Sequence, residues 1–452
     1  MFRTLKNAWK VPELRNKILF TLLIIVIYRL GASIIVPYVS RDVISAFDQT
    51  YGGTVLGFMS ILSGGALSQA TLFALSVSPY ITASIVMQLL TIAIPPLERM
   101  AKDEEGKKKI NIITRYVTVA LAIITAYGYT TLLDSNSWLI YTEDSTGAKV
   151  FAYFVVISCF CAGAAIIMWL AEKINEKGIG NGISIILFAN IISRLPSMCT
   201  QLYGWTSSKL DADGNLVEGF NWVGLIFAIL MALILIGLVV LSVWFTNSER
   251  RIPIQYAKRV VGRKMYGGQG TNLPLKMNMA GVMPIIFASS IVSIPATIVQ
   301  MFGLNEDANF GWFVTTYLQP KGSSGWVYIV LYLILLVAFS YFYIMITFNP
   351  VEVANNIKNN GGAIPGIRPG KPTSDYIKKI LNRVTFIGAI FLAVVACLPM
   401  ILGLIDTTSF GFAVGNFSFG GSSLLIVVGV ALETVHDLEA QLTMRNYKGF
   451  LN

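Results

Sequence analysis

The stretch that decides the fold is Ser63-Gly-Gly-Ala-Leu-Ser-Gln-Ala-Thr-Leu-Phe-Ala-Leu-Ser-Val-Ser-Pro-Tyr-Ile-Thr-Ala-Ser-Ile-Val-Met-Gln-Leu-Leu90. Its second half is almost long enough to span a membrane, yet hydroxyl and amide side chains are spread through it. Val77, Ile81 and Ile85 recur at every fourth position, which predicts a narrow aliphatic stripe along one helix. Such a helix either lines a cavity or packs its small residues tightly against neighbouring helices, and the stretch alone is compatible with both.

The segment just before this stretch predicts a re-entrant half-helix at about residues 54–66. Residues 54–62 are apolar but too few to cross a hydrocarbon core of about 30 Å. Gly64-Gly65 then allows the chain to reverse sharply, because glycine adopts backbone conformations that other residues avoid.

The composition indicates a polytopic membrane protein. Hydrophobic residues make up 55% of the 452 residues, charged residues make up 13%, and the mean hydropathy is +0.66. A soluble domain would carry about 25% charged residues. The four cysteines are expected to be packing residues, and no metal site or cofactor is expected. Ten apolar spans are predicted, at about 18–36, 71–94, 110–133, 150–171, 183–205, 222–246, 274–302, 325–348, 377–404 and 420–437.

The distribution of basic residues predicts the orientation of these spans. If the N-terminus is cytoplasmic, 28 of the 34 Lys and Arg residues fall on the cytoplasmic side and five on the external side. Both ends are then cytoplasmic, with residues 1–17 as an interfacial amphipathic helix and 438–452 as a tail. Arg29 lies within the first span, where it is either a functional residue or a side chain that reaches toward the surface.

Two cytoplasmic segments, 247–273 and 349–376, are unusually long. In the first, the alternation of Ile252, Ile254 and Tyr256 predicts a strand or hairpin that displays basic residues outward. In the second, Pro365-Gly-Ile-Arg-Pro-Gly370 predicts a stiff turn that projects Arg368. Exposed basic loops often do no more than fix topology, but topology alone does not need two such long segments. The alternative is that they bind a partner.

Two functions fit ten spans. Residues 18–205 and 206–437 would form two five-span halves of opposite orientation, which is the plan of many small-solute transporters. A coupled transporter needs ionisable groups near the midplane, and Arg29 is the single candidate. A passive pore closed by branched aliphatic side chains fits better, with a kinked, serine-rich seventh span that contains Pro284 and Pro295. An enzyme is not expected, because no span offers paired carboxylates or a nucleophile beside a base.

Five segments together resemble the signatures of the SecY family, the channel subunits of the bacterial protein-conducting translocon. They are Ser63-Gly-Gly-Ala-Leu-Ser68, Gly178-Ile-Gly-Asn-Gly-Ile-Ser184, Tyr256-Ala-Lys-Arg259, Leu275-Lys-Met-Asn-Met-Ala-Gly-Val282 and Pro365-Gly-Ile-Arg-Pro-Gly370. The resemblance runs in order over essentially the whole chain. It implies an all-α polytopic membrane protein, with ten transmembrane helices in two inverted pseudo-symmetric halves and a re-entrant plug half-helix. The implied function is a gated channel that passes unfolded preproteins and releases hydrophobic segments laterally into lipid.

The same resemblance implies roles for individual residues. The pore ring would be Val77, Ile81, Leu187, Ile191, Ile286 and Ile426, where Val77 and Leu187 depart from an all-isoleucine ring but remain bulky and apolar. The plug would include Leu56, Phe58, Met59, Ile61, Leu62, Gly64 and Gly65, and the lateral gate Thr82, Ile85, Gln88, Ser290 and Ile294. Partners would dock at Arg251, Lys258, Arg259 and Arg368.

The partners implied are small subunits resembling SecE and SecG, the motor ATPase SecA, the ribosome, signal sequences, nascent chains and membrane lipid. The location implied is the bacterial cell membrane. Because the chain has no site for coupling energy, the driving force is expected to come from the ribosome or the motor.

Overall fold

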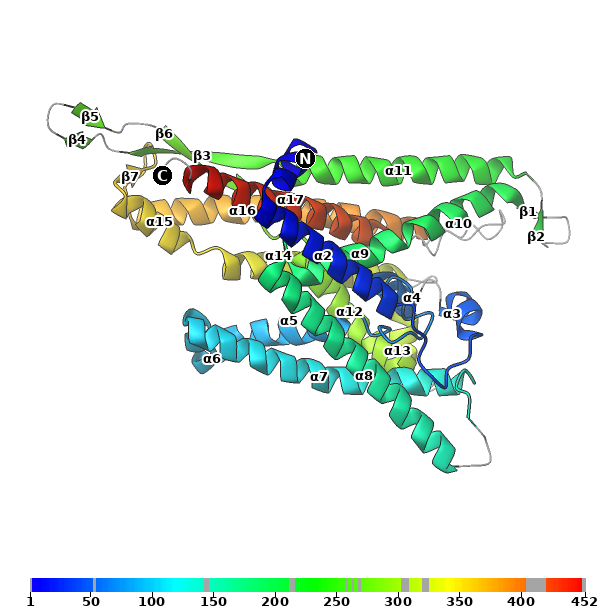
Figure 1. The fold of residues 1–452 in the computed structure, drawn as a ribbon. Helices are drawn as coiled ribbons and strands as arrows, with labels where there is room; N and C mark the ends of the chain where they lie inside the picture. The colour runs from blue at the N-terminus through cyan, green and yellow to red at the C-terminus, as the bar shows by residue number, and fades with distance from the viewer. Residues whose placement is uncertain are drawn as a thin grey trace.

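The computed structural model describes residues 2–51, 54–141, 146–210, 216–218, 220–256, 259–261, 264–266, 270–301, 309–318, 325–403 and 420–448. These residues fold mainly into helices, most of which lie roughly along one direction (Figure 1). The helices are α1 Phe2–Lys10, α2 Pro12–Gly31, α3 Val43–Tyr51, α4 Val55–Leu62, α5 Ser78–Ala93, α6 Pro95–Lys102, α7 Glu104–Ser135, α8 Thr146–Lys177, α9 Gly182–Ser193, α10 Leu195–Ser207, α11 Trp222–Thr246, α12 Met283–Met301, α13 Asn309–Tyr317, α14 Gly325–Thr347, α15 Pro350–Asn359, α16 Lys371–Gly403 and α17 Gly420–Lys448. The strands are β1 Ser208–Leu210, β2 Leu216–Glu218, β3 Glu249–Tyr256, β4 Arg259–Val261, β5 Lys264–Tyr266, β6 Gly270–Lys276 and β7 Gly362–Ala363.

Helices occur at each of the ten predicted spans. Within the described residues, six helical segments are long and apolar enough to cross a membrane, and the bent pair α5–α6 makes a seventh. Helices α2, α12 and α17 occupy the three remaining predicted spans. The fifth span is divided between α9 and α10, and α16 begins at Lys371, six residues before the predicted start.

The second span begins later than predicted. Helix α5 starts at Ser78, and residues 71–77 form turns instead of helix. Pro79 explains this boundary, since a proline fits in the first turn of a helix but would clash with a carbonyl one turn earlier if the helix extended back. Val77 is therefore the cap residue of α5, and only Ile81 and Ile85 lie on the helical part of the predicted stripe.

The seventh span is shorter than predicted for a related reason. Strand β6 continues to Lys276, and α12 begins only at Met283. Pro284 consequently lies in the first turn of α12, where proline is tolerated, and Pro295 is the proline inside the helix. The kink predicted for this span stays a prediction, and Pro295 is the proline placed inside the helix where it could cause one.

The N-terminal region is also divided differently from the prediction. Helix α1 ends at Lys10, and α2 begins at Pro12 rather than at residue 18. Val11 has an extended backbone, as expected for a residue that precedes proline. At the other end of the chain, α17 continues through Lys448, so most of the predicted tail is helical.

The glycine-rich segment 178–182 makes a tight entry into α9. Gly180 has a positive φ of 72°, and a Cβ built on Gly182 would lie 2.0 Å from the carbonyl oxygen of Ala171. Only glycine lets α9 start this close to α8. Asn181 caps the helix, because its side chain accepts a hydrogen bond from the backbone N–H of Ile183 at 3.1 Å.

The two long segments that were predicted to be cytoplasmic share one sheet, in the order β6-β3-β7. Strand β3 pairs antiparallel with β6 along its length, and its last residues, Gln255 and Tyr256, pair with Ala363 and Gly362 of β7. The predicted strand alternation is confirmed, since Ile252 and Ile254 are buried and the residue between them is exposed. A small apolar cluster supports the sheet, formed by Ile252, Ile254, Leu275, Ile357, Ile364 and Ile377.

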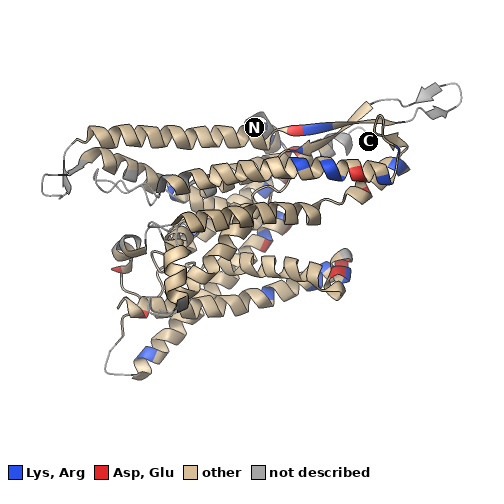
Figure 2. Ribbon diagram, turned by 180° about the vertical axis from the view of Figure 1, so that it is seen from behind, with Lys and Arg blue, Asp and Glu red and all other residues tan. Residues whose placement is uncertain are grey.

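Charged side chains gather at one end of the helices (Figure 2). This end carries α6, α15 and the sheet, which lie together at the left of Figure 1. Few charges are seen among the residues described at the opposite end, which carries α3 and α13. The long surfaces between the two ends are mostly uncharged, as a membrane-spanning bundle requires.

Candidate functional site

Helix α4 is the short re-entrant helix predicted before the glycine pair. It has eight residues, and the chain then turns back through Gly64 and Gly65, whose φ angles are 68° and 88°. Val55 and Leu56 are fully buried, and Phe58 is 2% exposed. Met59, Ile61 and Leu62 are half-buried and pack against the two main apolar clusters. The helix contacts α3, α9 and α12, so it lies inside the bundle.

The six candidate ring residues are brought into one apolar cluster. They come from the start of α5 and from α9, α12 and α17. Each is at most 6% exposed, and the same cluster contains Val55 and Phe58 of α4. Close packing of branched aliphatic side chains excludes water, so this arrangement can seal a passage.

Polar side chains beyond the ring bind α4 and the turns after it. The Nδ2 atom of Asn190 donates to the carbonyl oxygen of Leu62 at 2.9 Å and contacts Ser76 Oγ at 3.4 Å. The Nη2 atom of Arg194 donates to Ser60 Oγ at 2.6 Å and to Ser68 Oγ at 3.3 Å. The sequence analysis did not single out Asn190 or Arg194. The signal was present, because Leu187, Asn190, Ile191 and Arg194 follow the i, i+3, i+4, i+7 spacing of one helix face.

Arg29 also lies beside the turn after α4. Its Nη1 atom is buried without a hydrogen-bond partner in the described structure, and a Cβ built on Gly64 would lie 2.9 Å from it. The guanidinium group therefore faces the interior turn. Of the two alternatives for Arg29, this position favours a role inside the bundle over simple extension to the surface.

A cavity of about 180 Å³ lies between α5, α7 and α12 beside α4. Thr82, Ser290 and Ile294 line it, as do Phe58 and Met59 of α4. Ile85 and Gln88 do not line it, and Ile85 is instead buried in the cluster that contains the ring. Thr82 donates to Ser78 O and Ser293 donates to Ser290 O, each within its own helix, whereas Thr297 of α12 donates to the sulfur of Met59 in α4 at 3.4 Å. The two helices are therefore joined across this cavity mainly by packing.

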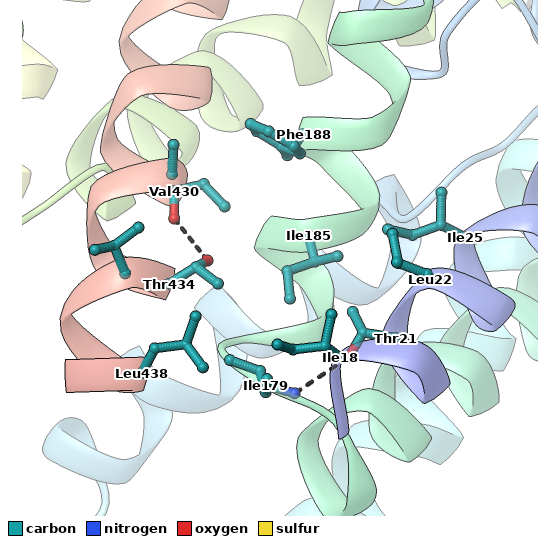
Figure 3. A pocket seen from close by; sticks show the side chains of 12 residues that line it. Ile18, Thr21, Leu22, Ile25, Ile179, Ile185, Phe188, Val430, Thr434 and Leu438 are labelled. Atoms are coloured by element: carbon teal, nitrogen blue, oxygen red, sulfur yellow. Dashed lines mark hydrogen bonds between the residues drawn. The ribbon is translucent and has the colours of Figure 1, made fainter. Parts of the chain in front are cut away.

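A second pocket, of about 310 Å³, lies between α2, α9 and α17 (Figure 3). Its lining is almost wholly apolar, and Ile18, Ile185, Phe188 and Leu438 are among the side chains that point toward it. The two hydroxyl groups in the wall are occupied: Thr434 donates to Val430 O, and Thr21 accepts from the backbone N–H of Ile179. The pocket therefore suits an apolar group.

The described candidate docking residues lie on or near the sheet β6-β3-β7. Arg251 of β3 is largely exposed and pairs with Glu249 at 2.6 Å. Arg368 is exposed on the turn after β7, where Gly366 and Gly370 have positive φ angles. Ile364 anchors this turn in the sheet cluster, and Thr373 Oγ1 donates to the carbonyl oxygen of Arg368 at 2.9 Å. Arg259 begins β4 without a described side chain, and Lys258 lies outside the described residues.

Comparison with known proteins gives a consistent result along the chain. A family model described as SecY matches residues 71–435. The protein translocase subunit SecY of Streptomyces coelicolor is 44% identical over 460 residues, and the match covers 100% of both chains. The same subunit of Corynebacterium glutamicum is 42% identical, with coverage of 98% of this chain and 99% of that protein.

Solved structures share the fold at lower identity. The structure reported as "The structure of a protein conducting channel" has a TM-score of 0.61 and 19% identity, and the match covers 96% of both chains. A canine Sec61 in a ribosome-channel complex has a TM-score of 0.57 and 16% identity, with the same coverage. The predicted ten-helix, all-α membrane fold is thereby confirmed. The chain belongs to the SecY family, and it is a protein-conducting channel subunit rather than an enzyme.

Proposed function

We propose that this chain holds a closed, ion-tight pore at rest, in which the six ring residues form the seal and α4 is the plug. The observation that carries the proposal is the burial of aliphatic side chains from α5, α9, α12 and α17 in one cluster with Val55 and Phe58. An unfolded preprotein would pass after α4 moves away and the ring side chains separate. The ring has no charged group to bind an ion, which disfavours a small-solute transporter.

We further propose that α5 and α12 part to release hydrophobic segments into lipid. The cavity lined by Thr82, Ser290 and Ile294 supports this, because few polar contacts would have to break for the helices to separate. Thr82 represents α5 at this opening better than Ile85 does, because Thr82 lines the cavity and Ile85 does not. The two halves 18–205 and 206–437 would then move as two bodies about this opening.

A crosslink across this cavity tests the release route. Cysteines at Thr82 and Ser290, joined by a short linker in a background without the native cysteines, should block insertion of a hydrophobic segment in proteoliposomes. Reduction of a cleavable linker should restore insertion. Cysteines at Val119 and Trp169, on lipid-exposed faces of α7 and α8, are the matched control. Modification of both sites with the same reagent should leave insertion of the hydrophobic segment unchanged. Normal insertion with the Thr82–Ser290 link fully formed would contradict the assignment.

We propose that the sheet β6-β3-β7 and the Arg368 turn form the docking surface for a ribosome or a motor ATPase of the SecA kind. The support is a rigid base with exposed arginines, and a canine relative of the same fold was solved with a ribosome. Guanidinium groups pair well with phosphates and carboxylates. Binding to purified ribosomes and to the motor should fall with rising salt; salt-independent binding would contradict the proposal.

We assign the apolar pocket between α2, α9 and α17 to the membrane helix of a small partner subunit resembling SecE, with one resembling SecG elsewhere. An apolar helix buries its face in such a groove. Phe188→Ala and Ile185→Ala should each weaken copurification of the SecE-like subunit, whereas Leu233→Ala on the exposed face of α11 should not. Equal copurification of all three variants would contradict this assignment.

We place the protein in the bacterial cell membrane with both termini cytoplasmic. The support is the gathering of charges at the end that carries the sheet and α6. A single cysteine at Lys371 should react with an impermeant maleimide only from the cytoplasmic side, and reaction only from outside would reverse the orientation.

A further inference from the structure

We propose that Asn190 and Arg194 form a polar latch that holds α4 closed and sets how readily the channel opens. This inference rests on the proposed role of α4 as the plug. It identifies positioning residues, because neither side chain belongs to the apolar ring or to the cavity between α5 and α12.

The latch residues are placed by the same helix that supplies two ring residues. Leu187 and Ile191 face the apolar cluster, and Asn190 and Arg194 follow on the same face toward the end of α9. Asn190 is fully buried. One face of α9 therefore contacts both the seal and the plug, so a movement of α9 would disturb both together.

The hydrogen bonds of the latch reach both sides of the turn after α4. Asn190 donates to the carbonyl oxygen of Leu62, the last residue of α4, and also contacts Ser76 just before α5. Arg194 joins Ser60 within α4 to Ser68 beyond the glycine pair. Two side chains on one element thus bridge the plug, the turn and the entry to α5.

Charge adds to this arrangement. The C-terminal end of a helix carries partial negative charge, and a cation beside it is stabilising. Arg194 lies there, with Nη2 3.3 Å from a Cβ built on Gly65, and Nη1 of Arg29 lies 2.9 Å from a Cβ built on Gly64. Within the protein interior these interactions are stronger than they would be in water. These interactions are lost when α4 moves away from α9, so the latch stabilises the closed state and not the open state.

The direct test measures exposure of the plug in the resting channel. A Val55→Cys reporter, in a chain whose native cysteines are replaced, lies at the far end of α4 from the latch and is fully buried. The channel is reconstituted with its small subunits, without preprotein, and labelled with an impermeant maleimide. Arg194→Ala should raise the labelling rate about tenfold, which corresponds to about 1.4 kcal/mol. Asn190→Ala should raise it several-fold, and Thr200→Ala, on the exposed side of α10, should leave it unchanged.

A double-mutant cycle separates the latch from general loosening. Ser60→Ala and Arg194→Ala remove the two partners of one hydrogen bond, so their effects should be non-additive. When a translocating preprotein occupies the channel, the reporter should be labelled at the same rate in the variants and in the parent, because the hydrogen bonds of the latch are then already broken. Additive effects, or rates within twofold of the parent for Arg194→Ala, would overturn the proposal.

Failure of the latch and failure of the proposed channel function would give different results. Preproteins with intact signal sequences should still cross channels that carry the latch variants, at normal protein yield. If the parent channel passes no preprotein, the proposed function fails. If it passes preprotein but the variants label like the parent, only the latch fails.

Discussion

The α4 region and the sheet β6-β3-β7 are both built from short, glycine-containing segments between long helices, but they are stabilised in opposite ways. Helix α4 is joined to its neighbours by a few side-chain hydrogen bonds and by apolar packing on every side. The sheet is joined by backbone pairing between two segments about a hundred residues apart and rests on its own apolar cluster. The first arrangement can be undone by the displacement of one helix. The sheet can change its shape only by unfolding, which suits a surface where a partner docks.

The largest effect should come from the seal itself. Replacing Ile81 and Ile191 together with serine should make the resting channel conduct ions at rates orders of magnitude above the parent, because smaller and polar side chains widen and wet the constriction. Single-channel recording measures this directly. A matched double variant at Ile123 and Ile226, both exposed on the outside of the bundle, should stay closed. A tight Ile81/Ile191 variant would mean that the cluster does not form the seal.

The next largest effect should come from Arg368, on the turn beside the sheet β6-β3-β7. Arg368→Glu should reduce stimulation of the motor ATPase by tenfold or more while membrane yield stays near normal, because an unpaired partner charge costs about 2–5 kcal/mol. The turn is exposed, so its fold should tolerate the change. Lys371→Glu reverses a charge nearby, at the start of α16, and should have a smaller effect. Full stimulation by Arg368→Glu would remove this arginine from the docking surface, and equal loss of yield would indicate misfolding.

The smallest effects should come from one glycine in each region, and they test the comparison most closely. Gly64 and Gly366 have similar φ angles, of 68° and 80°. Alanine at either position should cost about 1–2 kcal/mol of backbone strain. At Gly64 the added Cβ would also lie 2.9 Å from Arg29 Nη1 and 3.1 Å from the Cα of Asn190, whereas at Gly366 it would meet nothing within 4 Å.

Gly64→Ala should therefore expose the Val55→Cys reporter more strongly than strain alone explains, and Gly366→Ala should lower motor affinity only modestly. Maleimide labelling and motor binding measure the two effects. Equal, small effects at both positions would mean that the turn after α4 is no more confined than the exposed turn beside the sheet.

Much of the fold was predictable from local properties of the chain. Apolar length, the bias of basic residues and the glycine pair at 64–65 predicted the spans and the short helix α4, because each depends on a few neighbouring residues and on the membrane. The positions of several helix starts were not predicted. Pro12, Pro79 and Pro284 each lie in the first turn of a helix, and these helix starts were missed because the spans were placed by their apolar runs alone.

What only the tertiary structure decided depends on contacts between distant segments. Segments 247–273 and 349–376 were predicted separately. No pattern within either segment predicts that Tyr256 pairs with Gly362. Asn190 and Arg194 looked like ordinary interruptions of an apolar span until Leu62 and Ser60 were found beside them, more than a hundred residues away in the chain. A hydrogen bond inside a membrane protein needs a partner that the packing supplies. The sequence by itself determined that these donors had to be satisfied, and the packing of α4 against α9 decided which acceptors satisfy them.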